Sequence, residues 1–409
     1  MPTIQRRYSS RMPALTPWFA LLIAAIGNCG FWLFWFNRCN ATGLPRKATK
    51  ITEKVLVLAC FAIPISLFAL YRTQAHHWLI SSSDWLPNDA PGLAWWVHAG
   101  SWCAVVLGTV WIESRRTLFP SSNLIAQSSE LIRVATKIHS ECTGNRTTAL
   151  LNRIPGNQIS MLSVTRKELL LPRSCRHADG FRIGHISDIH FTGQMSRAYY
   201  EYVFDTFQNL QPDLIVLTGD IIDYDAYLGW IQPLLSKLAA PHGCSFILGN
   251  HDHRLTDWNI LVRLLTELGH FDVGQQAQSL TLQNGLTLHL QGNERPWFHR
   301  YHPSPLPKAC DSSESSNTLR IGLSHSPDQI LWARRMKLDL LFCGHTHGGQ
   351  ARFPLIGPLV APSWYGSRYA SGVFLCDQTL MHVSRGVAGT HPFRFWCPPE
   401  ISLLTLRSP

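Results

Sequence analysis

The chain has 409 residues, of which 45% are hydrophobic and only 15% charged, and its formal net charge is +10. This composition excludes a disordered or collagen-like chain, and the low charged fraction indicates a membrane portion. Residues 1–180 carry 19 basic and 8 acidic side chains, whereas residues 181–409 carry 17 and 18. The basic excess therefore lies beside apolar runs, and the near-neutral C-terminal part argues against nucleic acid as a partner.

Three apolar runs, at residues 15–36, 55–71 and 92–112, follow a basic tail at residues 1–14. About 20 apolar residues span the hydrocarbon core of a bilayer, so the runs predict three transmembrane helices. The first run is too long for a signal peptide and has no small-residue cleavage site. The alternative is that these runs form three buried helices of a soluble domain.

Basic residues next to the runs predict how the helices cross the membrane, because cytoplasmic loops are enriched in Lys and Arg. Nine follow the first and third runs: Arg38, Arg46, Lys47, Lys50, Lys54, Arg115, Arg116, Arg133 and Lys137. Four lie on the opposite side: Arg6, Arg7, Arg11 and Arg72. The excess predicts a multi-pass protein in which everything after residue 113 faces the cytoplasm.

The eleven cysteines are scattered, odd in number and without a CxxC pair. Such a distribution favours reduced thiols on the cytosolic side over a disulfide framework or a structural zinc site. This agrees with the orientation that the basic residues predict.

Residues 113–157 form an expected linker that includes an amphipathic segment at residues 131–138. Its apolar stripe consists of Leu131, Ile132, Val134, Ala135 and Ile138. A helix of this kind would lie on anionic lipid, or it would dock on the following domain as its first helix.

From about residue 158 onward, short apolar strands alternate with helical stretches. The expected strands are 181–187, 213–219, 245–249, 286–292, 320–325, 339–344, 381–385 and 401–406, and the expected helices include 197–211 and 256–268. A repeat of about 30 residues is typical of βαβ units, in which ligands gather at the carboxyl ends of the strands. The sequence therefore predicts an α/β domain over residues 158–409 with a site at those ends.

Polar residues suited to metal binding follow five of the strands. They are Asp188, His190, Asp220, Asp223, Asn250, His251, Asp252, His325, His345 and His347. In an extended segment the residues i and i+2 face the same side, so the D-x-H and H-x-H pairs should each aim at one point. Oxygen and imidazole ligands without thiolates suit a hydrolytic site for Mn, Fe or Zn, and they are too many for one tetrahedral ion.

The order D-x-H, G-D-x-x-D, G-N-H-D, a single His and G-H-T-H resembles the signature of calcineurin-like metallophosphoesterases across residues 160–409. The resemblance implies a four-layer αββα sandwich with two divalent metal ions, Mn in first place and Fe or Zn as alternatives. The implied ligands are Asp188, His190 and His347 for one metal, Asn250, His325 and His345 for the other, and Asp220 between them. His251 would be the catalytic histidine, with its ring held by Asp252.

Two cations about 4 Å apart clamp phosphoryl oxygens and activate a water, so the expected reaction is hydrolysis of a phosphoanhydride or phosphodiester. His251 would bond the phosphoryl oxygen or protonate the leaving group. Asp223 would support the ligands from behind.

HTHGGQ at residues 345–350 and CPPEISLLTL at residues 397–406 resemble a membrane-anchored branch of the family. That branch includes UDP-2,3-diacylglucosamine pyrophosphatase, which implies cleavage of this lipid-linked nucleotide to lipid X and UMP in lipid A biosynthesis, at the cytoplasmic face of the bacterial inner membrane. The alternatives are a membrane-tethered phosphodiesterase or phosphatase of broad or nucleotide specificity, and a scaffold without activity. The oligomeric state stays open.

Two loops bear on the substrate. Residues 351–370 carry large apolar side chains that form either an exposed lip for lipid or ordinary core. Residues 293–318 carry aromatic and arginine side chains, including Trp297, Arg300 and Tyr301. This cluster would stack on a uracil and pair with a diphosphate, or it is a solvated surface loop.

Overall fold

The structure is a computed structural model that describes residues 15–118, 121–300, 317–354 and 356–409. The chain divides into two compact units, Met1–Asn40 with Leu44–Thr117 and Ala41–Gly43 with Leu118–Pro409. The basic tail at residues 1–14, Tyr301 and Leu355 lie outside the described residues.

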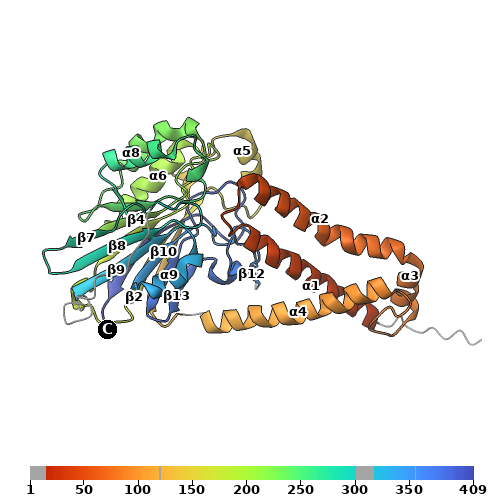
Figure 1. The fold of residues 1–409 in the computed structure, drawn as a ribbon. Coiled ribbons are helices and arrows are strands. Elements are labelled where there is room, and N and C mark those ends of the chain that lie inside the picture. Colours follow the sequence, from red (N-terminus) through yellow and green to blue (C-terminus); the bar gives the residue numbers. More distant parts are fainter. Residues whose placement is uncertain (1–14, 119–120, 301–316, 355) are drawn as a thin grey trace, which may run out of the picture. The chain divides into compact units, whose positions relative to one another are not determined.

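Helices make up the described part of the first unit (Figure 1). They are α1 (Thr16–Cys39), α2 (Arg46–Leu70), α3 (Arg72–Ser81) and α4 (Pro91–Leu118). Three helices, Thr16–Cys39, Arg46–Leu70 and Pro91–Ser114, are long and apolar enough to cross a membrane. At most 17% of the apolar window of each is buried, which disagrees with three helices buried in a soluble domain.

Close contacts between small residues join the helices of this unit. A Cβ atom on Gly27 of α1 would lie 1.8 Å from the carbonyl oxygen of Gly100 of α4. The Asn28 side chain donates to the Cys60 carbonyl of α2 (3.0 Å) and accepts from the Trp96 indole of α4 (3.3 Å). Small residues and interhelical hydrogen bonds of this kind hold helices together in lipid, where no hydrophobic force does so.

Two mixed β-sheets form the centre of the second unit. The seven-stranded sheet has the order β1 (Leu124–Arg133), β2 (Met161–Leu170), β15 (Glu400–Arg407), β3 (Arg182–Ile186), β4 (Leu214–Thr218), β5 (Cys244–Ile247) and β6 (Phe271–Asp272). The six-stranded sheet has the order β13 (Gly372–Cys376), β14 (Thr379–Val383), β10 (Leu340–Cys343), β9 (Thr318–Ser324), β8 (Thr287–Asn293) and β7 (Gln278–Thr281). The eight predicted strands are all confirmed.

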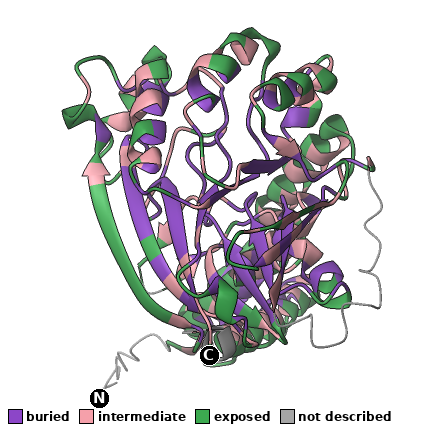
Figure 2. Cartoon of the chain, turned by 90° about the vertical axis from the view of Figure 1, so that its left-hand side faces the viewer, coloured by how far each residue is buried: buried purple, intermediate pink, exposed green. Residues whose placement is uncertain are grey.

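Helices cover the outer faces of both sheets, which gives four layers. The helices are α6 (Arg197–Gln208), α7 (Ile231–Leu235) and α8 (Trp258–Glu267) on the seven-stranded sheet and α9 (Ile330–Arg335) on the six-stranded sheet, with α5 (Arg146–Asn152) before β2. Apolar side chains such as Val216 and Ile321 fill the space between the sheets, and the central strands are accordingly buried, whereas a long edge strand is exposed (Figure 2). This αββα sandwich is the predicted fold.

The edge of the seven-stranded sheet that β1 forms differs from the helix predicted for this part of the chain. Residues 124–133 form strand β1, and only a single 3-10 turn follows at Val134–Thr136, so the expected amphipathic helix at residues 131–138 is wrong. β1 pairs antiparallel with β2, and most of its side chains are exposed. An edge strand with so little burial has no alternating apolar pattern, which is why its sequence does not predict it.

Candidate metal centre

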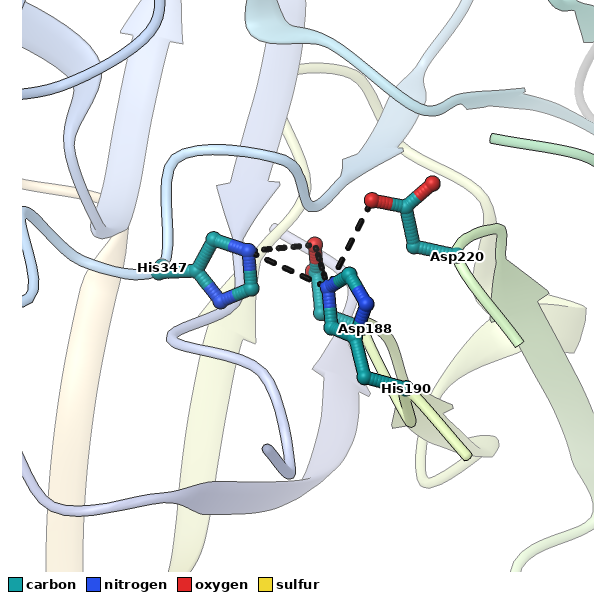
Figure 3. Close-up of side chains that lie close together, drawn as sticks. All are labelled: Asp188, His190, Asp220 and His347. Carbon is teal, nitrogen blue, oxygen red and sulfur yellow. Dashed lines mark hydrogen bonds and ion pairs between the residues drawn. The ribbon is translucent and has the colours of Figure 1, made fainter. Parts of the chain in front are cut away.

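The strand ends of both sheets bring the predicted ligands together. β3, β4 and β5 run parallel in one sheet and β9 and β10 in the other, so the residues after them can converge. Among the described residues, three groups of side chains hold ligand atoms within 4.8 Å of one another. Two consist of predicted ligands, Asp188, His190, Asp220 and His347 in the first and Asp220, His325 and His345 in the second, and the third joins His190 to Asp223 and His251. Figure 3 shows the first group. Asp220 belongs to both groups of predicted ligands, as a bridging carboxylate would.

Asn250 completes the second group, because its Oδ1 lies 3.1 Å from His325 Nε2. The ring atoms His345 Nδ1 and His325 Nε2 are 3.2 Å apart. All seven predicted ligands therefore lie in one cluster.

Unusual backbone conformations create this cluster. Asp188, His190, Asp220, His345 and His347 all have positive φ angles, between 49° and 68°. Non-glycine residues rarely adopt this left-handed conformation, and it concentrates at functional sites. The expectation of extended D-x-H and H-x-H segments is therefore wrong, although the side chains do converge, because left-handed turns after the strands bring them together.

Two glycines allow the backbone to approach the carboxylates. A Cβ atom on Gly249 would lie 2.3 Å from Asp220 Oδ1, and one on Gly344 would lie 2.3 Å from Asp188 Oδ2 and 1.8 Å from Ser187 Oγ. Any larger residue at either position would push a predicted ligand out of place.

Hydrogen bonds to one ring nitrogen orient three of the histidines. The bonds run from His190 Nδ1 to Asp223 Oδ2 (2.7 Å), from His325 Nδ1 to the Thr218 carbonyl (2.7 Å) and from His347 Nδ1 to the Ala388 carbonyl (3.1 Å). Each bond fixes the tautomer and leaves Nε2 available as a metal ligand. Two of these atoms, His190 Nε2 and His347 Nε2, lie 3.2 Å apart.

Burial and mutual charge act strongly on these groups. Burial raises the pKa of Asp188. Burial also acts to raise the pKa of Asp220, but the nearby histidines, His325 above all, outweigh it and hold that pKa well below its usual range. In turn the Asp220 carboxylate raises the pKa of His325 to about 9, although burial alone would lower it. The cluster therefore draws positive charge to its centre.

One buried atom tests whether metal ions fit here. Asp220 Oδ2 lies 3.2 Å from His325 Nε2 and 3.5 Å from His190 Nε2, yet it has no hydrogen-bond partner within the described ranges. A buried carboxylate oxygen without a partner is costly unless a cation neutralises it. Carboxylates, imidazoles and one amide suit divalent ions such as Mn, Fe or Zn. The residues thus fit two divalent metal ions, and their chemistry does not select one metal.

His251 lies beside the cluster with its ring held by Asp223. Its Nδ1 hydrogen-bonds to Asp223 Oδ1, and its Nε2 lies 2.7 Å from Arg254 Nη2. Burial lowers the pKa of His251 to about 4, so the ring is neutral near pH 7 and Nε2 accepts from the guanidinium. Sequence reasoning missed Arg254, since a single arginine three residues after the histidine carries no motif signal.

Asp252 has a different partner from the one predicted. Its carboxylate accepts the backbone N–H groups of Ile221, Ile222 and Gly249 at 2.8–3.0 Å. The prediction that Asp252 holds the His251 ring is therefore wrong, because all three bonds fix the loops after β4 and β5 instead. Asp252 is thus a positioning residue for the backbone that carries Asp220 and Asn250.

Asp223 joins a predicted metal ligand to the predicted catalytic histidine, because one oxygen binds His190 and the other His251. Asp223→Asn replaces one acceptor with a donor, so one ring loses its orientation. We expect losses of about 10- to 100-fold in metal affinity or kcat/KM, measured by metal titration and by hydrolysis of a nitrophenyl phosphodiester. Asp225→Asn, two residues further along the same loop, is the matched control and should keep both values. Unchanged values in Asp223→Asn would contradict this role.

Trp297 also lies at the cluster. Its ring centroid is 4.7 Å from that of His345 and 5.4 Å from that of His325. Arg300 faces elsewhere, since its guanidinium binds Asp272 (2.6 Å) and Glu294 (2.8 Å). The predicted pairing of Arg300 with a diphosphate is therefore not supported, whereas stacking on Trp297 stays open.

A hairpin of β11 (Arg352–Phe353) and β12 (Gly357–Pro358) follows the last metal motif. It packs against the loop of His347, because a Cβ atom on Gly349 would lie 2.2 Å from Pro358 Cβ. Large exposed apolar side chains on or beside the hairpin are Phe353, Ile356, Val360 and Trp396, here termed the apolar lip. The expectation of an exposed lip is confirmed for Phe353, Ile356, Val360 and Trp364 of the predicted loop, whereas Leu359 and Tyr365 are half-buried and Trp396 lies outside the predicted range.

The fold and the metal cluster agree with comparisons to known proteins. The sequence model of the family described as calcineurin-like phosphoesterase matches residues 181–349. The chain is 35% identical over 248 residues to the uncharacterized metallophosphoesterase YkuE of Bacillus subtilis, covering 60% of this chain and 84% of YkuE. It is 30% identical over 234 residues to phosphodiesterase YaeI of Escherichia coli, covering 56% and 83%. The chain therefore belongs to the calcineurin-like phosphoesterases, which are metal-dependent hydrolases.

A third relative names a substrate. The chain is 26% identical over 299 residues to the UDP-2,3-diacylglucosamine pyrophosphatase LpxG of Chlamydia muridarum, covering 60% of this chain and 89% of LpxG. Family membership makes the protein a hydrolase, and the alternative of a scaffold without activity is set aside.

Proposed function

We propose that this protein is a membrane-bound phosphoesterase that hydrolyses UDP-2,3-diacylglucosamine to lipid X and UMP. The observation that carries the proposal is the apolar lip next to the loop of His347, in a chain with three candidate membrane spans. Exposed apolar side chains beside a site for charged phosphates suit a substrate with acyl chains and a diphosphate. The similarity to LpxG supports the same substrate.

The proposed orientation puts the catalytic unit on the cytoplasmic side of the bacterial inner membrane. It rests on the excess of basic residues after the first and third spans. A multi-pass protein in this orientation meets a cytoplasmic nucleotide lipid without moving it across the bilayer.

The proposed ligands of one metal are Asp188, His190 and His347, those of the other are Asn250, His325 and His345, and Asp220 bridges the two. When bound, two divalent cations neutralise charge on the phosphoryl group and lower the pKa of a water. Arg254 is within reach of a phosphoryl oxygen that approaches His251, and its guanidinium suits such an oxygen. Asp223 orients His251 so that Nε2 faces the leaving group. Trp297 offers an aromatic face to a base.

The second candidate is a membrane-tethered phosphodiesterase of broad specificity. The similarity to YaeI, whose name gives phosphodiesterase activity, favours it. In that case the spans serve only as an anchor and the lip contacts no substrate.

Phosphorus NMR of the full chain with Mn and UDP-2,3-diacylglucosamine in mixed micelles separates the two candidates. We expect UMP and a lipid monophosphate to form. Cleavage of a nitrophenyl phosphodiester without turnover of the lipid would keep the metal chemistry and discard the lipid substrate.

The lip makes a further prediction about the acyl chains. Phe353, Val360 and Trp396 are 50%, 46% and 60% exposed, and burying such side chains contributes about 1.5–3 kcal/mol each when complete. Replacing all three with serine should raise KM for the acylated substrate at least about tenfold. Hydrolysis of a soluble nitrophenyl phosphodiester should stay unchanged.

Serine substitutions at Leu331 and Leu375, which are exposed on α9 and β13, form the control. They remove exposed apolar side chains outside the lip and should leave KM for the lipid unchanged. An equal rise in KM from both sets would argue against a specific role of the lip.

A further inference from the structure

A continuous set of polar side chains lies buried between the two sheets, behind the metal cluster. It consists of Lys167, Glu400, His382, His185, Thr218 and Ser187, here termed the Lys167 network, and none is more than 4% exposed. His382 comes from the six-stranded sheet, and the others come from strands β2, β15, β3 and β4 of the seven-stranded sheet or follow β3. The surrounding space between the sheets is filled by apolar side chains.

Hydrogen bonds connect the network from end to end. The distances are 3.1 Å from Lys167 Nζ to Glu400 Oε1, 2.8 Å from Lys167 Nζ to His382 Nε2, 2.8 Å from His382 Nδ1 to His185 Nδ1, 2.9 Å from His185 Nε2 to Thr218 Oγ1 and 2.7 Å from Thr218 Oγ1 to Ser187 Oγ. The last hydroxyl lies beside the Asp188 carboxylate, because a Cβ atom on Gly344 would be 1.8 Å from Ser187 Oγ and 2.3 Å from Asp188 Oδ2. A hydrogen bond from Ser187 acts to lower the pKa of Asp188. The network therefore ends on a proposed ligand of the first metal.

These bonds can run in only one direction. Burial lowers the pKa of Lys167, but the Glu400 carboxylate at 3.1 Å opposes this effect and favours the ammonium group, which donates and cannot accept. His382 must then accept at Nε2 and donate from Nδ1 to His185, whose own Nε2–H donates to Thr218. Burial holds the pKa of His382 well below its usual value and lowers that of His185 to about 3, so both rings are neutral, as this order requires.

Thr218 connects the network to the second metal group as well. Its hydroxyl donates to Ser187, while its backbone carbonyl accepts from His325 Nδ1 at 2.7 Å. Thr218 thus belongs to the chain of hydrogen bonds that leads to Asp188, and it also orients the ring of His325.

A buried ion pair and two buried imidazoles cost desolvation free energy, and apolar residues of similar volume often stabilise a core as well or better. We propose that the Lys167 network is a positioning device, which aims the Ser187 hydroxyl at Asp188 and so holds that carboxylate toward the first metal position. This inference rests on the ligand roles of Asp188 and His325 proposed above.

Metal titration of the full chain in detergent, followed by electron paramagnetic resonance of Mn, tests the proposal. Thr218→Val removes only the hydroxyl and keeps the carbonyl that orients His325, and it should weaken Mn binding about 10- to 100-fold. Thr218→Ser restores the hydroxyl and should bind within about threefold of the unaltered chain. Lys167→Met should also weaken Mn binding. Without the ammonium group, His382 is no longer forced to accept at Nε2, so the hydrogen bonds toward Ser187 lose their fixed direction.

Arg173→Met is the control for general destabilisation. It breaks the ion pair of Arg173 with Asp339, before β10 and thus at the opposite strand end from the metal ligands. It should lower Tm without changing Mn affinity. Thr218→Val with a lowered Tm but unchanged Mn affinity would overturn the positioning role. Absence of Mn binding in the unaltered chain would instead overturn the proposed ligand set.

Discussion

Asp220→Ala is expected to abolish turnover of every substrate, because Asp220 is the one carboxylate shared by both groups of predicted ligands. Asp220 Oδ2 lies 3.2 Å from His325 Nε2 and 3.5 Å from His190 Nε2. Without this carboxylate, the proposed ligand nitrogens have no shared negative charge beside them to balance a cation. Bound metal contributes several kcal/mol to the transition state, so the loss should reach at least about 10³-fold in kcat. The metal content of the purified protein should fall from two ions toward zero.

Asp225→Ala is the matched control for this substitution. Asp225 lies in the same loop, but its carboxylate accepts from Thr256 at an exposed position. It should retain both metals and full activity. Two bound ions and undiminished turnover in Asp220→Ala would contradict the shared site, whereas two bound ions with lost turnover would restrict Asp220 to catalysis.

The sequence predicts the ligand cluster because its signal is local. Each ligand follows a buried strand, and parallel strands in one sheet end at one edge, so positions such as Asp188 and Asn250 could be named without coordinates. The eight strands could be predicted for the same reason, since their apolar runs are short and bounded by polar residues.

Contacts that depend on turn geometry could not be predicted. Asp252 is adjacent to His251 in sequence, yet the His251 ring hydrogen-bonds to Asp223. Asp223 lies in the loop after β4, which begins with a left-handed residue, Asp220 (φ 53°). Backbone N–H groups then take up the Asp252 carboxylate. Sequence neighbours cannot reveal such a choice, because it depends on which loop is closer.

Buried polar residues were hidden for another reason. Lys167 lies in TRKELL of β2, which reads as a charged surface segment, and only the pairing of β2 with β15 brings it to Glu400. Strand β1 was not predicted for a related reason, since an exposed edge strand has no apolar face that would identify it in the sequence. Both features depend on strand pairing between residues far apart in the chain.

His251→Ala should separate substrates by their leaving groups. A protonated ring assists departure of an alkoxide, and such general acid catalysis contributes typically ~10²–10⁴-fold. A phosphate monoester, which is the leaving group in the lipid substrate whichever phosphorus is attacked, departs without that help. We therefore expect a loss of about 10²-fold in kcat for an alkyl phosphodiester and less than about tenfold for UDP-2,3-diacylglucosamine, measured in steady state with the same enzyme preparations.

The resting protein holds His251 neutral, with a pKa lowered by burial to about 4. Proton donation therefore requires the substrate to change its surroundings. A phosphoryl oxygen that takes Arg254 away from Nε2 replaces a positive neighbour with a negative one, and this change favours the protonated ring. Equal losses on both substrates would show that His251 stays neutral and only binds the phosphoryl group. Arg254→Ala would then lower kcat/KM without distinguishing the two leaving groups.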